Sequence, residues 1–171
     1  MNFSRFILIL FFMMFGCSYA NVWKQPVSSE EIVKETPKLK SIKGTFSQEK
    51  ILPNIKKTLI SYGDFEFTEN KGISFYTVSP VKSEVDYTNK KYKQINDIVN
   101  AIASKKYKKL EQKFDFYLDR NYNILIIGLK PKDKNKEFIS SVTIEIKNSD
   151  YIKKIKIELS DGGTTTVWFV K

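Results

Sequence analysis

The stretch from Lys43 to Pro80 constrains the fold of this chain more than any other. It contains three segments in which large apolar residues alternate with polar ones, and each segment ends in turn-forming residues. In the middle segment Phe65 and Phe67 share one face, while Glu66 between them points to the other. This period of two is that of a β-strand with one buried face. The stretch therefore predicts a curved antiparallel meander.

Gly63 lies at the point where the alternation in the middle segment changes phase. Before it the apolar residues are Ile60 and Tyr62, and after it they are Phe65 and Phe67. A glycine inside a strand pattern marks a bulge or a close approach of another backbone. We therefore expect an irregularity of the strand at Gly63.

The rest of the chain predicts more strands around a pair of helices. Ile95, Ile98, Val99 and Ile102 recur at helical spacing, and a second, short helix is expected near Leu110. Further strands are expected at 82–87, 91–93, 114–120, 123–129, 138–147, 151–159 and 164–170, and an N-terminal helix at 29–40, broken or kinked at Pro37. Residues 124–127 are continuously apolar, which predicts a strand buried on both faces. The expected fold class is mainly β with a helical lid (α+β), built on about eight to ten antiparallel strands in an open sheet.

Histidine is absent from the sequence, and Cys17 is the only cysteine. Catalysis by cysteine and histidine and nearly all zinc sites need these residues. Asp64 and Glu66 are close enough to act as an acid–base pair, but they share the strand face opposite the phenylalanines, where solvent surrounds them. The sequence Asp161-Gly162-Gly163 is typical of a hairpin turn. We expect neither enzymatic activity, nor a cofactor, nor a metal site.

Residues 1–20 predict an export signal. Arg5 is followed by an apolar run and by the small-residue site Ser18-Tyr19-Ala20. Cleavage after Ala20 leaves one exported domain, residues 21–171. Lipidation of Cys17 is the alternative, and it would tether the protein to a membrane. The apolar run is too short for a spanning helix.

The chain is basic, with 29 lysines and arginines against 19 acidic residues and a formal net charge of +10. The lysines are dispersed along the predicted strands, unlike the arginine-rich surfaces that read nucleic acid bases. We expect a solvated surface with weak attraction to anionic membranes, and no nucleic acid partner.

Several short motifs, taken in order, resemble the LolA family of periplasmic outer-membrane lipoprotein carriers. They are Phe46-x-Gln48, Gly63-Asp64-Phe65, Ile73-x-Phe75 and Ser79-Pro80, followed by Thr88-Asn89-Lys90 where the family has an Asp-Gly-Lys turn. The spacing from the glycine to the closing proline fits without gaps, and the resemblance covers about residues 39–93. It implies a strongly bent, incomplete antiparallel β-barrel with helices over its concave face. It also implies a periplasmic chaperone for lipoprotein localization.

The resemblance further implies an apolar cleft that binds the acyl chains of a lipoprotein or another lipid. Partners would be an inner-membrane releasing machinery and an outer-membrane acceptor, with the carrier a monomer. Glu69, followed by Asn70, stands where the family has an arginine and a proline that help to hold the lid closed, so the gate is expected to differ. The expected lining residues are Phe46, Leu52, Phe65, Phe67, Ile73, Phe75, Val85, Ile95, Ile98, Val99, Ile102, Leu125 and Ile127.

Three other interpretations stay open at this point. The cargo can be a non-protein acyl lipid, since some LolA-like proteins lack the lid arginine. A lipidated Cys17 would make the protein a membrane-anchored, LolB-like acceptor. The third alternative is a structural or sensor domain with a filled core and no ligand. The residues alone favour an ordinary core for the four phenylalanines among the expected lining residues, while the resemblance favours a cleft. These four are Phe46, Phe65, Phe67 and Phe75.

Overall fold

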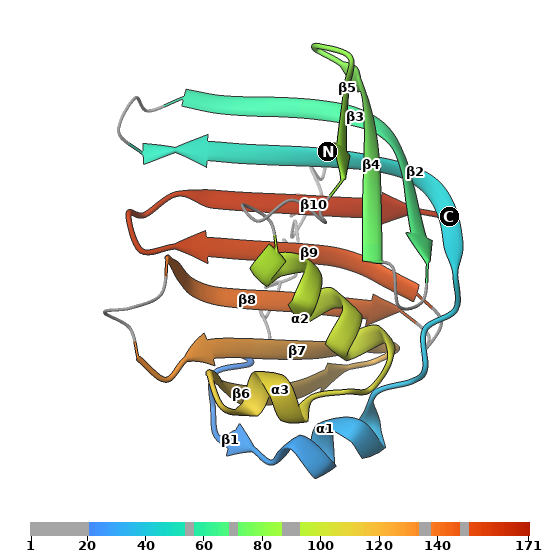
Figure 1. The fold of residues 1–171 in the computed structure, drawn as a ribbon. Coiled ribbons are helices and arrows are strands. Elements are labelled where there is room, and N and C mark those ends of the chain that lie inside the picture. The colour runs from blue at the N-terminus through green and yellow to red at the C-terminus, as the bar shows by residue number, and fades with distance from the viewer. Residues whose placement is uncertain (1–20, 54–56, 69–71, 87–92, 134–137, 148–150) are drawn as a thin grey trace, which may run out of the picture.

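A computed structural model of the chain describes residues 21–53, 57–68, 72–86, 93–133, 138–147 and 151–171 (Figure 1). The expected signal segment, the proposed gate at Glu69 and the turn at Thr88-Asn89-Lys90 lie outside these residues. The side chains of Val85 and Ile95 also lie outside the described part, although their backbones belong to a strand and a helix.

Ten strands form a single antiparallel sheet in the order β1-β6-β7-β8-β9-β10-β2-β3-β4-β5. Within the described residues β1 and β5 each pair with one strand, so the sheet stays open. The chain is therefore mostly β, with few helices and an unclosed sheet, which confirms the expected fold class at that level. The strands are β1 Pro26–Val27, β2 Ile42–Leu52, β3 Lys57–Thr68, β4 Gly72–Ser79, β5 Ser83–Asp86, β6 Phe114–Asn121, β7 Ile124–Pro131, β8 Ile139–Lys147, β9 Tyr151–Leu159 and β10 Thr164–Val170.

Three helices accompany the sheet within the described ranges. They are α1 (Ser29–Glu35), α2 (Lys93–Ala103) and α3 (Lys108–Glu111). Figure 1 shows α2 and α3 lying across one face of the sheet, and α1 near β6 at its lower edge. Because α2 and α3 follow β5 and precede β6, the chain crosses this face on its way from one end of the strand order to the other.

The irregularity expected at Gly63 is confirmed. The register between β3 and β4 shifts between Tyr62 and Gly63. A Cβ added at Gly63 would lie 2.0 Å from the carbonyl oxygen of Tyr76, so only glycine allows the two backbones to approach this closely.

Two expected elements differ from the observed ones. The N-terminal helix begins after Ser28, whose hydroxyl oxygen accepts a hydrogen bond from the Glu31 amide, but it ends at Glu35 rather than near residue 40. Proline at position 37 disfavours helical backbone in the residue before it, so the break expected at Pro37 is confirmed and only the continuation to residue 40 is wrong. Lys93, expected in a strand, belongs to α2 instead.

A short N-terminal segment, which the sequence did not predict to pair, adds an edge strand to the sheet. β1 pairs with β6, and Trp23 before it packs edge-on against Tyr117 with ring centroids 5.2 Å apart. Its ring also covers Gly128 on β7, where an added Cβ would lie 2.7 Å from it. Despite this cover Ile124 and Ile126 stay half-exposed, so β7 is fully buried on its inner face alone, contrary to the expectation.

Candidate functional site

The candidate site is the apolar interior between the sheet and α2. Of the four α2 side chains expected to face the sheet, Ile98, Val99 and Ile102 are buried there, and Ile95 lies outside the described side chains. The three buried side chains join a single apolar cluster with residues from β2, β3, β4 and every strand from β6 to β10. Amphipathic spacing alone places these residues inside, because a helix that covers a sheet buries one apolar stripe.

Four phenylalanines form the aromatic part of this interior. Phe46 and Phe75 pack edge-on with centroids 4.7 Å apart, and Phe65 packs in the same way on Phe169 at 4.8 Å. Phe75 and Phe169 lie 6.0 Å apart and close the group. These edge-to-face contacts add stability beyond the burial of area, so the aromatic group is a well-packed core as it stands.

Most of the expected lining residues come together in this interior. Leu52 does not, because it lies half-buried at the far end of β2 and outside the cluster. Val85, Ile95 and the gate residue Glu69 fall outside the described side chains. Those that the structure brings together in the cluster are Phe46, Phe65, Phe67, Ile73, Phe75, Ile98, Val99, Ile102, Leu125 and Ile127.

The sequence interpretation missed several residues of the same interior. Phe169 on β10 lies directly opposite Phe46 on β2, and Leu39 closes the end of the interior just before β2. The alternation of Val167 and Phe169 on the last strand could have identified the first. Leu39 lies in an irregular segment, where periodicity gives no signal.

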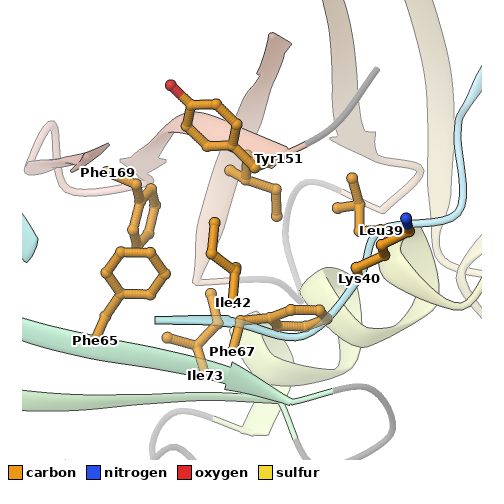
Figure 2. Close-up of a pocket in the computed structure, with 9 residues that line it drawn as sticks. Leu39, Lys40, Ile42, Phe65, Phe67, Ile73, Tyr151 and Phe169 are labelled. Atoms are coloured by element: carbon orange, nitrogen blue, oxygen red, sulfur yellow. The ribbon is translucent and has the colours of Figure 1, made fainter. Parts of the chain in front are cut away.

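A narrow slot opens at one end of the interior (Figure 2). Its volume is about 10 Å³, which is roughly the space of one water molecule. Figure 2 shows apolar side chains converging on the slot, with the Tyr151 hydroxyl pointing away from them. The slot is lined by Leu39, Lys40, Ile42, Phe65, Phe67, Ile73, Tyr151, Ile152 and Phe169.

The slot is too small to admit a hydrocarbon chain as it stands. The described apolar side chains of the interior are buried. An acyl chain would need α2 or the phenylalanines to move.

The C-terminal end of α2 is held by Lys105. This residue has a left-handed backbone (φ 59°), and the next amide, of Lys106, donates back to the Ala101 carbonyl. The Lys105 ammonium donates to the Val33 carbonyl on α1 at 3.1 Å. The contact joins the ends of two helices, so it ties α2 to α1.

Tyr107 lies under the connection between α2 and α3. Its side chain is fully buried against Phe116, with ring centroids 5.9 Å apart, and its hydroxyl donates to the Ile102 carbonyl at 3.3 Å. Burial raises the pKa of Tyr107 above its ordinary range, because a phenolate would lose its hydration there. Tyr107 is therefore a neutral structural contact.

The expected solvent exposure of the Asp64 and Glu66 face is confirmed in part. Asp64 is exposed, while Glu66 is half-buried and forms an ion pair with Lys43 on the outer face, with 3.1 Å between Nζ and Oε1. In the described part of the chain, the acidic side chains form no group that could hold a metal ion. None of the described helices has both the length and the apolar character needed to cross a bilayer.

The described geometry defines an open, bent antiparallel sheet with an apolar interior under a helix. No protein-family model matches the sequence, and no curated protein matches it. The fold is similar to the crystal structure of a LolA superfamily protein from Nitrosomonas europaea, at 10% sequence identity and a TM-score of 0.34. The likeness covers 85% of this chain and 92% of that one.

Proposed function

We propose that the protein is a periplasmic carrier that binds the acyl chains of a lipoprotein, or of another lipid, beneath α2. It would shuttle them between an inner-membrane releasing machinery and an outer-membrane acceptor as a monomer. No covalent chemistry is involved, because holding and release follow from apolar contact alone.

One observation carries the proposal: α2 meets the sheet through apolar side chains. The buried residues on its described part are Ile98, Val99, Ala101, Ile102 and Ala103. Hydrophobic contact is non-directional and roughly proportional to area. An acyl chain can therefore replace these apolar contacts against the sheet.

The energetics of this exchange favour a long hydrocarbon. Each methylene removed from water contributes about 0.8 kcal/mol, so a few acyl chains offset the loss of the α2 contacts. The closed form then competes with the ligand. The apparent affinity is therefore weaker when a smaller fraction of the molecules is open. Release needs only the return of α2 or a competing apolar site.

The burial of the interior side chains also supports a second candidate, a structural domain with no ligand. The slot of about 10 Å³ favours this candidate, since a carrier with an open cleft would have room for its cargo. The two candidates differ in whether α2 can leave the sheet at low cost.

Native mass spectrometry of protein purified from its source separates these candidates. A carrier is expected to retain a bound acyl lipid or lipidated peptide, and the lipid-free protein should bind a fluorescent fatty-acid analogue. The same spectrum reads the N-terminus: a start at Asn21 supports a soluble carrier, and an acylated Cys17 supports the anchored acceptor. Protein without bound lipid that also fails to bind the analogue would support the filled core.

Lys105→Met tests the role of α2 directly. It removes the ammonium that bonds to the Val33 carbonyl and keeps the apolar stem, so α2 is released from α1. We expect about fivefold tighter binding of the analogue, which is the effect of losing one hydrogen bond from the closed form. Lys106→Met is the matched control, because Lys106 is exposed and contributes a backbone bond to the helix end.

Phe75→Asp provides the opposite test. Phe75 is buried between Phe46 and Phe169, so a carboxylate there should abolish binding of the analogue. Circular dichroism must show that this variant still folds. A folded Phe75→Asp protein that binds as the wild type does would refute the assignment of the interior as the lipid site.

A further inference from the structure

The turn end of the β2–β3 hairpin, here residues 50–52 and 57–62, exposes apolar side chains in a way that the fold does not explain. β3 pairs with β2 along its whole length, from Phe67 opposite Ile42 to Lys57 opposite Leu52. The pairing of β4 with β3 reaches only to Tyr62, so residues 57–61 have β2 as their one described neighbour. Figure 1 shows this end of the hairpin extending beyond α2, β4 and β5.

This segment carries aliphatic side chains on both faces. Leu59 and Ile60 are consecutive, so they point to opposite faces of the sheet, and they are 44% and 50% exposed. Ile51 and Tyr62 extend the exposed apolar surface on the face of Ile60. A strand that packs on a core has polar residues on its solvent face, and this segment does not follow that rule.

Lysines accompany these aliphatic residues on the inner face. Lys50 lies directly opposite Leu59, and Lys57 lies opposite Leu52, and both lysines are exposed. The described carboxylates nearby are Glu49, opposite Ile60, and Asp161 in the turn that precedes β10. The inner face of the hairpin end is therefore apolar and cationic.

We propose that this hairpin end docks onto an anionic lipid surface. A rigid protein partner would cover one face of the strand, whereas the headgroup region of a bilayer can surround both. Lysine stems lie along apolar surface while their ammonium groups reach anionic headgroups. The unpaired backbone edge of residues 57–61 needs water or headgroups as hydrogen-bond partners, so the hairpin enters only the interface and not the hydrocarbon.

A second copy of the chain is the competing occupant, because an unpaired strand edge is a template for pairing with another strand. Lys57 on the edge opposes such pairing, since two copies would bring like charges together. The docking site does not depend on the interior under α2, so it holds whether or not that interior binds acyl chains.

Flotation with lipid vesicles tests the proposal. The protein is residues 21–171, which hold every residue of the described core, and the vesicles are phosphatidylcholine alone or equal parts of phosphatidylcholine and phosphatidylglycerol. We expect binding to the anionic vesicles that weakens as salt is raised. The double variant Leu59→Ser/Ile60→Ser should lower this binding at least about tenfold, because it removes two of the four exposed apolar side chains.

Val170→Ser is the matched control. Val170 is an exposed aliphatic residue (61%) at the end of β10 that lies away from the hairpin end. It should bind vesicles as the wild type does. Lys50→Gln/Lys57→Gln should lower binding to the anionic vesicles by about fivefold for each lysine, and leave binding to phosphatidylcholine unchanged. All substituted side chains are exposed, and unchanged melting temperatures would confirm intact folds.

Several results would overturn the inference. They are wild-type protein that stays unbound with both kinds of vesicle, or a serine double variant that binds as tightly as the wild type. Sedimentation that shows a wild-type dimer, dissociated by Leu59→Ser/Ile60→Ser, would assign the surface to a second copy instead. Failure to bind vesicles leaves the fatty-acid assay untouched, so the two proposals can fail separately.

Discussion

The two ends of β3 contain similar residues in opposite environments. At one end Phe65 and Phe67 are 4% and 3% exposed, because α2 and the neighbouring strands cover the inner face. At the other end Leu59 and Ile60 are about half-exposed, and β4 has already separated from the strand. Alternation along a strand therefore predicts which side chains share a face, but the helices and neighbouring strands decide how far the core extends.

The largest expected effect is at the buried end. Phe65→Ala should lower the free energy of unfolding by about 3–5 kcal/mol, because it leaves a cavity beside Phe169. Leu59→Ala on the same face of the same strand should lower it by less than about 1 kcal/mol. Urea denaturation of both variants gives the comparison. Similar losses for the two would show that the core extends along the whole strand.

The boundary between the two ends is at Gly63. Gly63→Ala should lower the free energy of unfolding by about 2 kcal/mol or more, since the new methyl group meets the Tyr76 backbone. Gly128→Ala is the matched case, because there the methyl group meets the Trp23 ring, which can move away. We expect a loss of about 1 kcal/mol and a shift in tryptophan fluorescence. A Gly63→Ala protein as stable as the wild type would contradict the tight approach of β3 and β4.

A smaller effect on stability is expected at the start of α1, away from β3. Ser28→Ala removes the hydroxyl that accepts from the Glu31 amide, and this should cost about 1 kcal/mol. Ser28→Asp retains an acceptor at the same position and should restore most of the stability. Thermal unfolding followed by circular dichroism measures both, and equal melting temperatures for Ser28→Ala and the wild type would exclude a role for the cap.

The smallest effect is on the outer face, at Glu158. Its carboxylate accepts hydrogen bonds from the Lys156 ammonium and the Ser141 hydroxyl, each at 2.6 Å, and these bonds lower its pKa. The stabilisation is present above the pKa of the unfolded chain and is lost as pH falls through the lower folded-state pKa. Water screens this half-exposed group, so the contribution is under about 1 kcal/mol. Glu158→Gln should remove that part of the pH dependence of unfolding, and an unchanged profile would contradict it.

The sequence predicted the strands well, because alternation survives wherever one face is buried. β9 and β10 have the expected bounds, and the close backbone approach expected at Gly63 is present. The N-terminal strand was missed, since two residues carry no period. The break of the N-terminal helix at Pro37 was predicted, while its continuation to about residue 40 was wrong.

The candidate site was predictable in its residues but not in its state. Helical spacing identified Ile98, Val99 and Ile102, and alternation identified Phe46, Phe65, Phe67 and Phe75 but not Phe169. Whether these groups leave a cleft or fill it depends on the distance between sheet and helix, which no periodicity contains. The prediction for Leu52 was wrong because β2 continues past the core in which Phe46 is buried.

The most direct test of the account is hydrogen exchange of α2 with and without a long-chain fatty acid. The central claim is that α2 is an apolar cover that an acyl chain displaces from the sheet. We therefore expect the amides of α2 to exchange faster when the fatty acid is bound, while those of β7 and β8 keep their protection. Slow exchange in α2 that matches the strands, with or without the fatty acid, would contradict the claim.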